Sequence, residues 1–236
     1  MSHNTGDDTG KTVMISGGGG GLGLSVVATM LERGANVIVP CRGDRDRQAL
    51  DGLAGPRLER IIVDDLASEA EVEQLYRNAP PLWASIHLAG AFATANVTET
   101  TLAAFRAQLD INLVSCFLCS REAIRSMRKT GAGGRIVNVT ARAALVPASG
   151  MAAYVTAKAA VSALTAALSV EVAPEGILVN AVAPSIIDTP ANRAAMPTAD
   201  FSRWPKAAEL ARAIAYLASA DNTLTSGAIV PVYGRA

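Results

Sequence analysis

The sequence predicts a single α/β domain built on a doubly wound, parallel sheet of seven strands. Short apolar runs alternate with helical patterns from one end of the chain to the other, and the apolar runs contain few polar interruptions. Strands of that kind are buried on both faces, as they are when helices cover both sides of a parallel sheet. The chain has 236 residues, half of them hydrophobic, which is enough for one large core.

Each strand is predicted from a short apolar run, and each helix from apolar residues spaced three and four apart. No linker or repeat interrupts residues 11–236, so a cofactor half (about 11–95) and a catalytic half (about 96–236) form one domain. The predicted strands are 13–16, 36–41, 58–63, 83–88, 134–140, 178–182 and 228–232. The predicted helices are 22–32, 44–53, 69–77, 102–128, 151–172 and 207–218.

The composition narrows the possible partners. Lys plus Arg and Asp plus Glu both number 21, and this balance gives no reason to expect nucleic acid or an anionic membrane. The longest uncharged run, residues 12–31, contains five consecutive glycines, which argue against a membrane span. Asp7 and Asp8 stand where a signal peptide would be basic, so we expect no signal peptide. We expect the polar residues 1–10 to form a disordered tail.

The cysteines indicate a reducing compartment, so we expect a cytoplasmic protein. Their number is odd and no secretory signal precedes them. Cys116 and Cys119 have the spacing of a metal site, but no second pair completes four ligands. We therefore expect two small residues on a packed helix and no metal.

A glycine-rich turn between the first strand and the first helix predicts dinucleotide binding. Such glycines allow a tight turn and a close approach of the backbone, and the helix N-terminus offers amide donors to a pyrophosphate. This arrangement is typical of the Rossmann-type fold. The turn contains Gly17, Gly18, Gly21, Leu22 and Gly23.

The end of the second strand favours NADP over NAD. NAD sites place Asp or Glu there for the ribose hydroxyls, whereas an arginine accommodates a 2′-phosphate. Cys41 holds the acidic position in this chain, and Arg42 follows it. Without a carboxylate to repel phosphate, we expect NADPH to be the cofactor.

Tyr154 and Lys158 lie four residues apart, one turn apart on the same face of a predicted helix. The free phenol has a pKa near 10, so Tyr154 needs help to exchange a proton near neutrality. We expect the Lys158 ammonium to lower that pKa. The pair predicts a proton donor beside a bound dinucleotide.

The glycine-rich turn, the end of the second strand and the Tyr154/Lys158 pair follow one another along the chain in the order found in the short-chain dehydrogenase/reductase family, and the resemblance covers essentially the whole chain. The resemblance implies that Asn112, Tyr154 and Lys158 are catalytic and that Lys158 also binds the nicotinamide ribose. It also implies that Asn112 maintains the long helix and a water beside Lys158. Further cofactor contacts are implied for Asp65 and Leu66 at the adenine, Ala89 and Gly90 in the groove, and Pro184, Ile187 and Thr189 at the nicotinamide.

Several positions depart from the family pattern, among them Leu88 beside His87 and Ser185 after Pro184, and two of the departures bear on catalysis. His87 stands where an asparagine is usual, and we expect it to close its strand structurally and not to act in catalysis. Ala141 replaces the catalytic serine, which removes one donor to the developing oxyanion. Thr140 would point to the opposite face of the strand unless the strand end bends, and Ser149 is a second possible donor.

Residues 141–151 and 188–204 also resemble dihydropteridine reductases locally, and that group likewise lacks the serine. We therefore predict hydride transfer from NADPH to an electrophilic C=N or C=O bond, with a quinonoid dihydropteridine as one candidate substrate. The alternatives are a 3-oxoacyl or ketone reductase of the same family and an inactive NADP-binding regulatory protein. Small apolar residues on the two long helices, 102–128 and 151–172, pack closely, and by resemblance a homodimer or homotetramer forms there.

Overall fold

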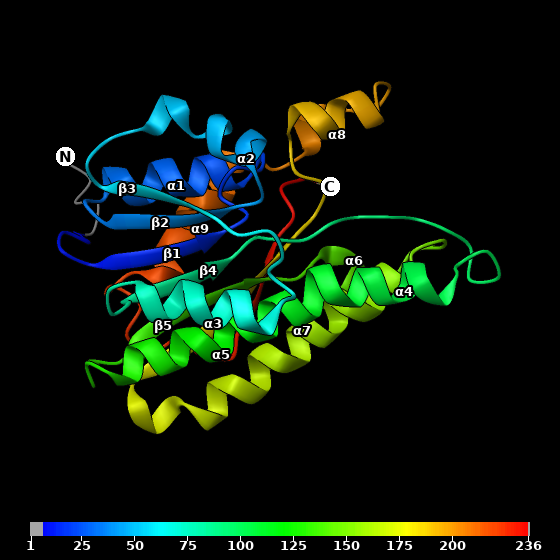
Figure 1. The fold of residues 1–236 in the computed structure, drawn as a ribbon. Helices are drawn as coiled ribbons and strands as arrows, with labels where there is room; N and C mark the ends of the chain where they lie inside the picture. The colour runs from blue at the N-terminus through cyan, green and yellow to red at the C-terminus, as the bar shows by residue number, and fades with distance from the viewer. Residues whose placement is uncertain (1–6, 236) are drawn as a thin grey trace.

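The computed structural model describes residues 7–235 and contains the predicted seven-stranded parallel sheet (Figure 1). The strand order is β3-β2-β1-β4-β5-β6-β7, so the direction of winding reverses between β1 and β4. In a doubly wound sheet, ligands bind beyond the carboxyl ends of the strands at this point. The strands are β1 Thr12–Ser16, β2 Asn36–Cys41, β3 Leu58–Ile62, β4 Ala84–His87, β5 Gly134–Val139, β6 Ile177–Pro184 and β7 Ile229–Val232.

Helices cover both faces of the sheet (Figure 1). On one face, α1 (Gly23–Glu32) packs beside α9 (Ala207–Ala218), with the short α2 (Asp44–Ala49) at the edge. On the other face lie α3 (Glu69–Asn78), α5 (Ser115–Arg128) and α7 (Ala152–Glu171). Each side has its own buried apolar cluster, which explains why the strands carry apolar residues without alternation.

The predicted helix 102–128 is one continuous helical stretch with a change of winding in the middle. It consists of α4 (Leu102–Leu109), a π-helical segment (Asp110–Val114) and α5. Such segments are rare and frequently occur at functional sites. Asn112 lies in the π-helical segment, so the irregularity falls on a predicted site residue.

Other element boundaries differ from prediction. The helix predicted over 44–53 ends at Ala49, and a 3₁₀ turn covers Asp51–Leu53. Residues 190–204, outside the predicted helices and strands, contain α8 (Pro190–Ala195) and a 3₁₀ turn (Phe201–Arg203). The N-terminus of α8 is stabilised by Thr189, whose Oγ1 accepts a hydrogen bond from the Asn192 amide. The structure also contains α6 (Arg142–Leu145) and a 3₁₀ turn over Ala173–Glu175.

Residues 1–6 of the predicted disordered tail lie outside the described part of the chain, and within residues 7–10 the structure packs Asp8 against the fold. Asp8 is fully buried, and its amide donates to the Arg33 carbonyl oxygen at 2.8 Å. Its carboxylate pairs with Arg33 and Lys11. A polar sequence therefore packs here, because each buried charge has an opposite charge beside it.

The two long apolar helical stretches are only partly buried in the core. Residues Leu102–Arg128 and Ala152–Glu171 are long and apolar enough to cross a membrane by length and composition alone. The α5 part of the first stretch and α7 each place one side on the sheet, whereas α4 packs against α7 (Figure 1). On α7, the buried side is a narrow stripe of residues: Ala157, Lys158, Val161, Thr165 and Ser169.

Candidate active site

Helix α7 brings Tyr154 and Lys158 to the carboxyl end of β5. Lys158 is only 6% exposed, and its Nζ donates a hydrogen bond to the Val139 carbonyl oxygen at 2.9 Å. Val139 is the last residue of β5. The strand end therefore fixes the direction of the ammonium, and Tyr154 lies one helical turn before it.

Burial dominates the proton affinities of this pair. It raises the pKa of Tyr154 to about 12. It also lowers the pKa of Lys158 to about 8, an effect that the nearby Cys116 partly offsets. The expected lowering of the Tyr154 pKa by Lys158 is therefore wrong for this structure, because desolvation disfavours both charged forms. At neutral pH, Tyr154 is a protonated phenol that can give up a proton.

Asn112 holds the segment after β4 against the active-site lysine. Its Nδ2 donates to the Ala91 carbonyl oxygen at 3.0 Å, and its Oδ1 accepts from the Ala91 amide at 3.2 Å. A Cβ atom built on Gly90 would lie 2.6 Å from Asn112 Oδ1 and 3.2 Å from Lys158 Nζ. The structure therefore brings together three predicted site residues: Asn112, Gly90 and Lys158.

The glycine-rich turn forms a cradle that admits backbone and little else. Gly17 has a φ of +72°, and a Cβ there would lie 2.7 Å from the Ala89 amide nitrogen. Gly18 lies against Val39, and a Cβ on Gly21 would lie 2.9 Å from the Thr189 Cγ2 atom. Leu22 immediately precedes α1, which begins at Gly23, so the N-terminus of α1 adjoins the turn. These features fit the pyrophosphate of a dinucleotide.

The segment after β6 forms the opposite wall of this cradle. Pro184, the last residue of β6, is buried, and Ile187 and Thr189 are partly buried. The Asn192 Nδ2 donates to the Ile187 carbonyl oxygen at 2.8 Å, which ties the segment to α8. Arg193 makes two hydrogen bonds to the Asp188 carboxylate, at 2.6 and 2.8 Å.

The adenosine end contains one feature that the sequence analysis missed. Cys41 is fully buried and Arg42 is exposed, but the Asp46 carboxylate accepts a hydrogen bond from the Arg42 amide at 3.2 Å. A carboxylate therefore does lie beside the end of β2. The only sequence signal was an acidic residue in the first turn of α2. Asp65 is exposed on the loop after β3, and Leu66 packs against the core under α3.

The Thr140 hydroxyl does not take the place of the serine that Ala141 replaces. The Thr140 hydroxyl donates to the Lys158 carbonyl oxygen at 2.7 Å and lies 2.9 Å from Ser162 Oγ. The Thr140 side chain therefore faces α7 and is hydrogen-bonded to it, as the alternation of strand residues predicts. Ser149 is exposed on the loop before α7. A second missed neighbour is Phe92, whose ring packs edge-on against Tyr154 at 5.0 Å between centroids.

His87 belongs to a buried polar network and has a structural role. Its Nδ1 lies 2.8 Å from Asn138 Oδ1, and its Nε2 lies 2.8 Å from Ser85 Oγ. Because a carbonyl oxygen only accepts, Nδ1 donates to Asn138 and Nε2 accepts from Ser85. Burial lowers the pKa of His87 to about 4, so the ring is neutral near pH 7. The cysteines are also inert, since burial raises the pKa of Cys116 to about 11 and of Cys119 to about 12.

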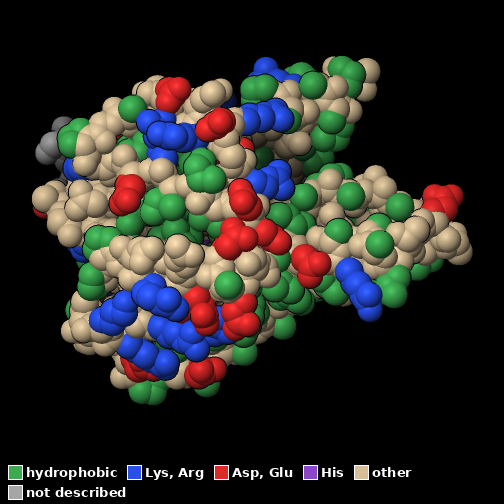
Figure 2. Space-filling model, in the orientation of Figure 1, with side chains coloured by type: hydrophobic (Ala, Val, Ile, Leu, Met, Phe, Trp, Pro, Cys, Tyr) green, Lys and Arg blue, Asp and Glu red, His purple; other side chains and the backbone are tan. Residues whose placement is uncertain are grey.

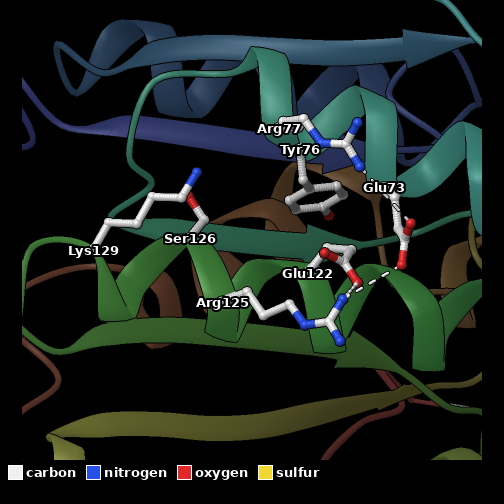
Figure 3. Close-up of a pocket in the computed structure, with 7 residues that line it drawn as sticks. All are labelled: Glu73, Tyr76, Arg77, Glu122, Arg125, Ser126 and Lys129. Atoms are coloured by element: carbon white, nitrogen blue, oxygen red, sulfur yellow. Dashed lines mark hydrogen bonds and ion pairs between the residues drawn. The ribbon is translucent and has the colours of Figure 1, made fainter.

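A separate cavity of about 260 Å³ lies between α3 and α5 (Figure 3). There Arg125 bonds to Glu122 at 2.8 Å and to Glu73 at 3.5 Å. Figure 2 shows the charged side chains of this region as mixed blue and red over α3 and α5. The Ser126 hydroxyl, in the cavity wall, accepts from the Leu82 amide just before β4 begins. The cavity therefore lies at the amino ends of the strands, at the opposite end of the sheet from Tyr154.

Comparisons with known proteins agree with this geometry. Residues 11–200 match the family model described as short chain dehydrogenase. A 2,5-dichloro-2,5-cyclohexadiene-1,4-diol dehydrogenase from Sphingobium indicum is 34% identical over 197 residues, covering 80% of this chain and 78% of that protein. A 3-oxoacyl-[acyl-carrier-protein] reductase from Rickettsia felis is 30% identical over 242 residues, covering 97% of both chains. The structure of ElxO with NADP bound superposes with a TM-score of 0.86 at 25% identity, covering 95% of this chain and 97% of that one.

Proposed function

The chain belongs to the short-chain dehydrogenase family and is an NAD(P)-dependent oxidoreductase, and from this premise we propose that it reduces an electrophilic C=N or C=O bond with NADPH. We propose a quinonoid dihydropteridine as the substrate class. The observation that carries this proposal is the pairing of an intact Tyr154 and Lys158 with Ala141, where Thr140 cannot substitute as a donor. A substrate that is already a reactive hydride acceptor has less need of the missing hydroxyl.

In the proposed mechanism, the glycine-rich turn and the N-terminus of α1 would hold the pyrophosphate, and Ile187 and Thr189 would hold the nicotinamide. When bound, the reduced nicotinamide supplies the hydride. Tyr154 is protonated at neutral pH and would give its phenolic proton to the nitrogen or oxygen of the double bond, whose carbon receives the hydride. Lys158 is mostly charged at pH 7, and its contact with Val139 holds the ammonium at the end of β5, where it would bind the cofactor ribose. Asn112 keeps the loop after β4 in place beside it.

Substrate tests separate this proposal from its alternatives. NADPH oxidation is measured with quinonoid dihydropterin, with a panel of simple ketones and with a 3-oxoacyl thioester. Preferential turnover of the pterin supports the proposal, and preferential turnover of the thioester supports the ketone-reductase alternative, a class that includes the Rickettsia felis relative. Tight NADPH binding without turnover of any of them supports a regulatory protein.

The preference for NADPH rests on the exposed Arg42 at the end of β2. A guanidinium is a good partner for a 2′-phosphate. The ElxO neighbour was solved with NADP bound, which supports the same choice. The three buried free cysteines support the cytoplasmic location that we propose.

We also propose that the outer faces of α5 and α7 join copies of this chain in a homodimer or homotetramer. The side of α7 that faces away from the sheet is apolar and exposed, with Val170 at 77% exposure. Phe117 on α5 is also exposed. The exposed side of α7 also carries small residues, which allow a second helix to approach closely: Ala159, Ala163, Ala166 and Ala167. Light scattering tests this, since Ala163→Glu should convert the assembly to a smaller species.

A further inference from the structure

The edge of the cofactor site at the end of β2 holds a carboxylate that none of the family motifs places there. Asp46 Oδ2 accepts a hydrogen bond from the Arg42 backbone N–H at 3.2 Å. A Cβ built on Gly19, in the glycine-rich turn, would lie 2.7 Å from the Asp46 carbonyl oxygen and 3.2 Å from its Cβ. Asp46 therefore lies between the tip of β2 and the glycine-rich turn.

The charge of Asp46 acts on Cys41, the residue at the end of β2 beside which the cofactor ribose is expected. Burial raises the pKa of the Cys41 thiol, and the Asp46 charge raises it further, whereas Arg60 and Arg47 lower it. Arg60 is engaged elsewhere, because it pairs with Asp51. Within residues 7–235, Arg42 forms no ion pair. Charges of both signs therefore lie near the end of β2: the Asp46 carboxylate and the Arg47 guanidinium both act on Cys41, and Arg42 is the next residue in the chain.

The charges of Arg42 and Asp46 act in opposite directions on a 2′-phosphate. The adenosine ribose of a dinucleotide lies between the glycine-rich turn and the end of the second strand. A phosphate there carries nearly two negative charges, which the Arg42 guanidinium attracts and the Asp46 carboxylate repels. Asp46 also occupies the Arg42 N–H, a donor that a phosphate would otherwise use. A free 2′-hydroxyl carries no charge and can donate to a carboxylate.

We propose that Asp46 is a specificity-determining residue that narrows the preference for NADPH over NADH created by Arg42. The inference rests on the proposed function, because it assumes that a dinucleotide binds at this edge. It predicts that the protein binds both cofactors, and that Asp46 limits how much more tightly it binds NADPH than NADH. Sequence motifs alone assign this position to Cys41 and Arg42 and leave Asp46 out.

Calorimetric binding of two cofactor fragments tests this without turnover. The probes are 2′,5′-ADP, which has the 2′-phosphate, and 5′-AMP, which lacks it. Asp46→Asn keeps an acceptor oxygen for the Arg42 N–H and removes the charge. It should tighten 2′,5′-ADP binding roughly tenfold and change 5′-AMP binding by less than about twofold. Asp44→Asn is the matched control, because Asp44 is an exposed acid in the same first turn of α2.

The proposal is overturned if Asp46→Asn leaves 2′,5′-ADP binding unchanged or weaker, or if Asp44→Asn has the same effect. Asp46→Ser serves as a second variant should the asparagine change the thermal melting of the protein. If the wild type binds neither fragment, the proposed cofactor site is wrong. If both fragments bind and the variants do not discriminate between them, only the role of Asp46 is wrong.

Discussion

Replacing Ala141 by serine asks whether this active site lacks a group that its substrate needs. Ala141 is 8% exposed and directly precedes α6, in extended conformation. Removing one oxyanion donor costs on the order of 3 kcal/mol in an enzyme that depends on it, or about 10² to 10³ in rate. The Thr140 hydroxyl cannot cover that loss, because it donates to the Lys158 carbonyl oxygen at 2.7 Å.

We expect Ala141→Ser to change the rate by less than about threefold with quinonoid dihydropterin, since that substrate does not depend on the donor. The same small effect is expected for ketones and a 3-oxoacyl thioester, because they are not the substrates for which the site is built. The assay is kcat/KM from NADPH oxidation with each compound. Ala143→Ser adds the same hydroxyl two residues further along the chain and controls for effects on folding.

A gain on the order of 10² or more with ketones or the thioester, absent from Ala143→Ser, would refute this reasoning. Such a result would mean that the site performs ordinary carbonyl reduction and is impaired by the lost serine. The substrate class would then be that of the ketone-reductase alternative.

Three further outcomes follow from the charges in the structure. Burial lowers the pKa of Lys158 to about 8 from 10.5, so the unfolded chain binds more protons between these values. The free energy of unfolding should therefore rise with pH across that window by up to roughly 3 kcal/mol, and urea unfolding of Lys158→Met should lack this rise. The pKa of His87 is lowered to about 4 from 6.5, so stability should fall as pH drops through that window, and less so in His87→Asn. Arg42→Ala should raise KM for NADPH about tenfold while KM for NADH changes little, and an equal loss for both would remove Arg42 from cofactor selection.

The fold could be predicted because its signals are local and repeated. Continuous apolar runs identify buried strands, and the glycine-rich turn fixes where the first helix begins. Tyr154 and Lys158 could be predicted because four residues make one helical turn. The side of the strand that Thr140 faces also followed from simple alternation, and its contact with Lys158 confirms it.

What the sequence could not reveal depends on contacts and burial. The hydrogen bond from the Arg42 amide to Asp46 depends on how the chain turns between β2 and α2, which the predicted helix start at Asp44 does not specify. The edge-on packing of Phe92 depends on how the loop after β4 folds back. The pKa of Tyr154 moved opposite to expectation, because spacing predicted its charged neighbour and said nothing of desolvation.

The central claim is that Tyr154 acts as a general acid without the usual serine, and Tyr154→Phe tests it most directly. The measurement is kcat/KM for NADPH-dependent reduction of quinonoid dihydropterin, paired with the Kd for NADPH. We predict a loss of about 10² to 10⁴ in kcat/KM with a Kd within about twofold of wild type, because only the phenolic proton is removed. Full activity in the variant would contradict the claim and exclude Tyr154 as the proton donor.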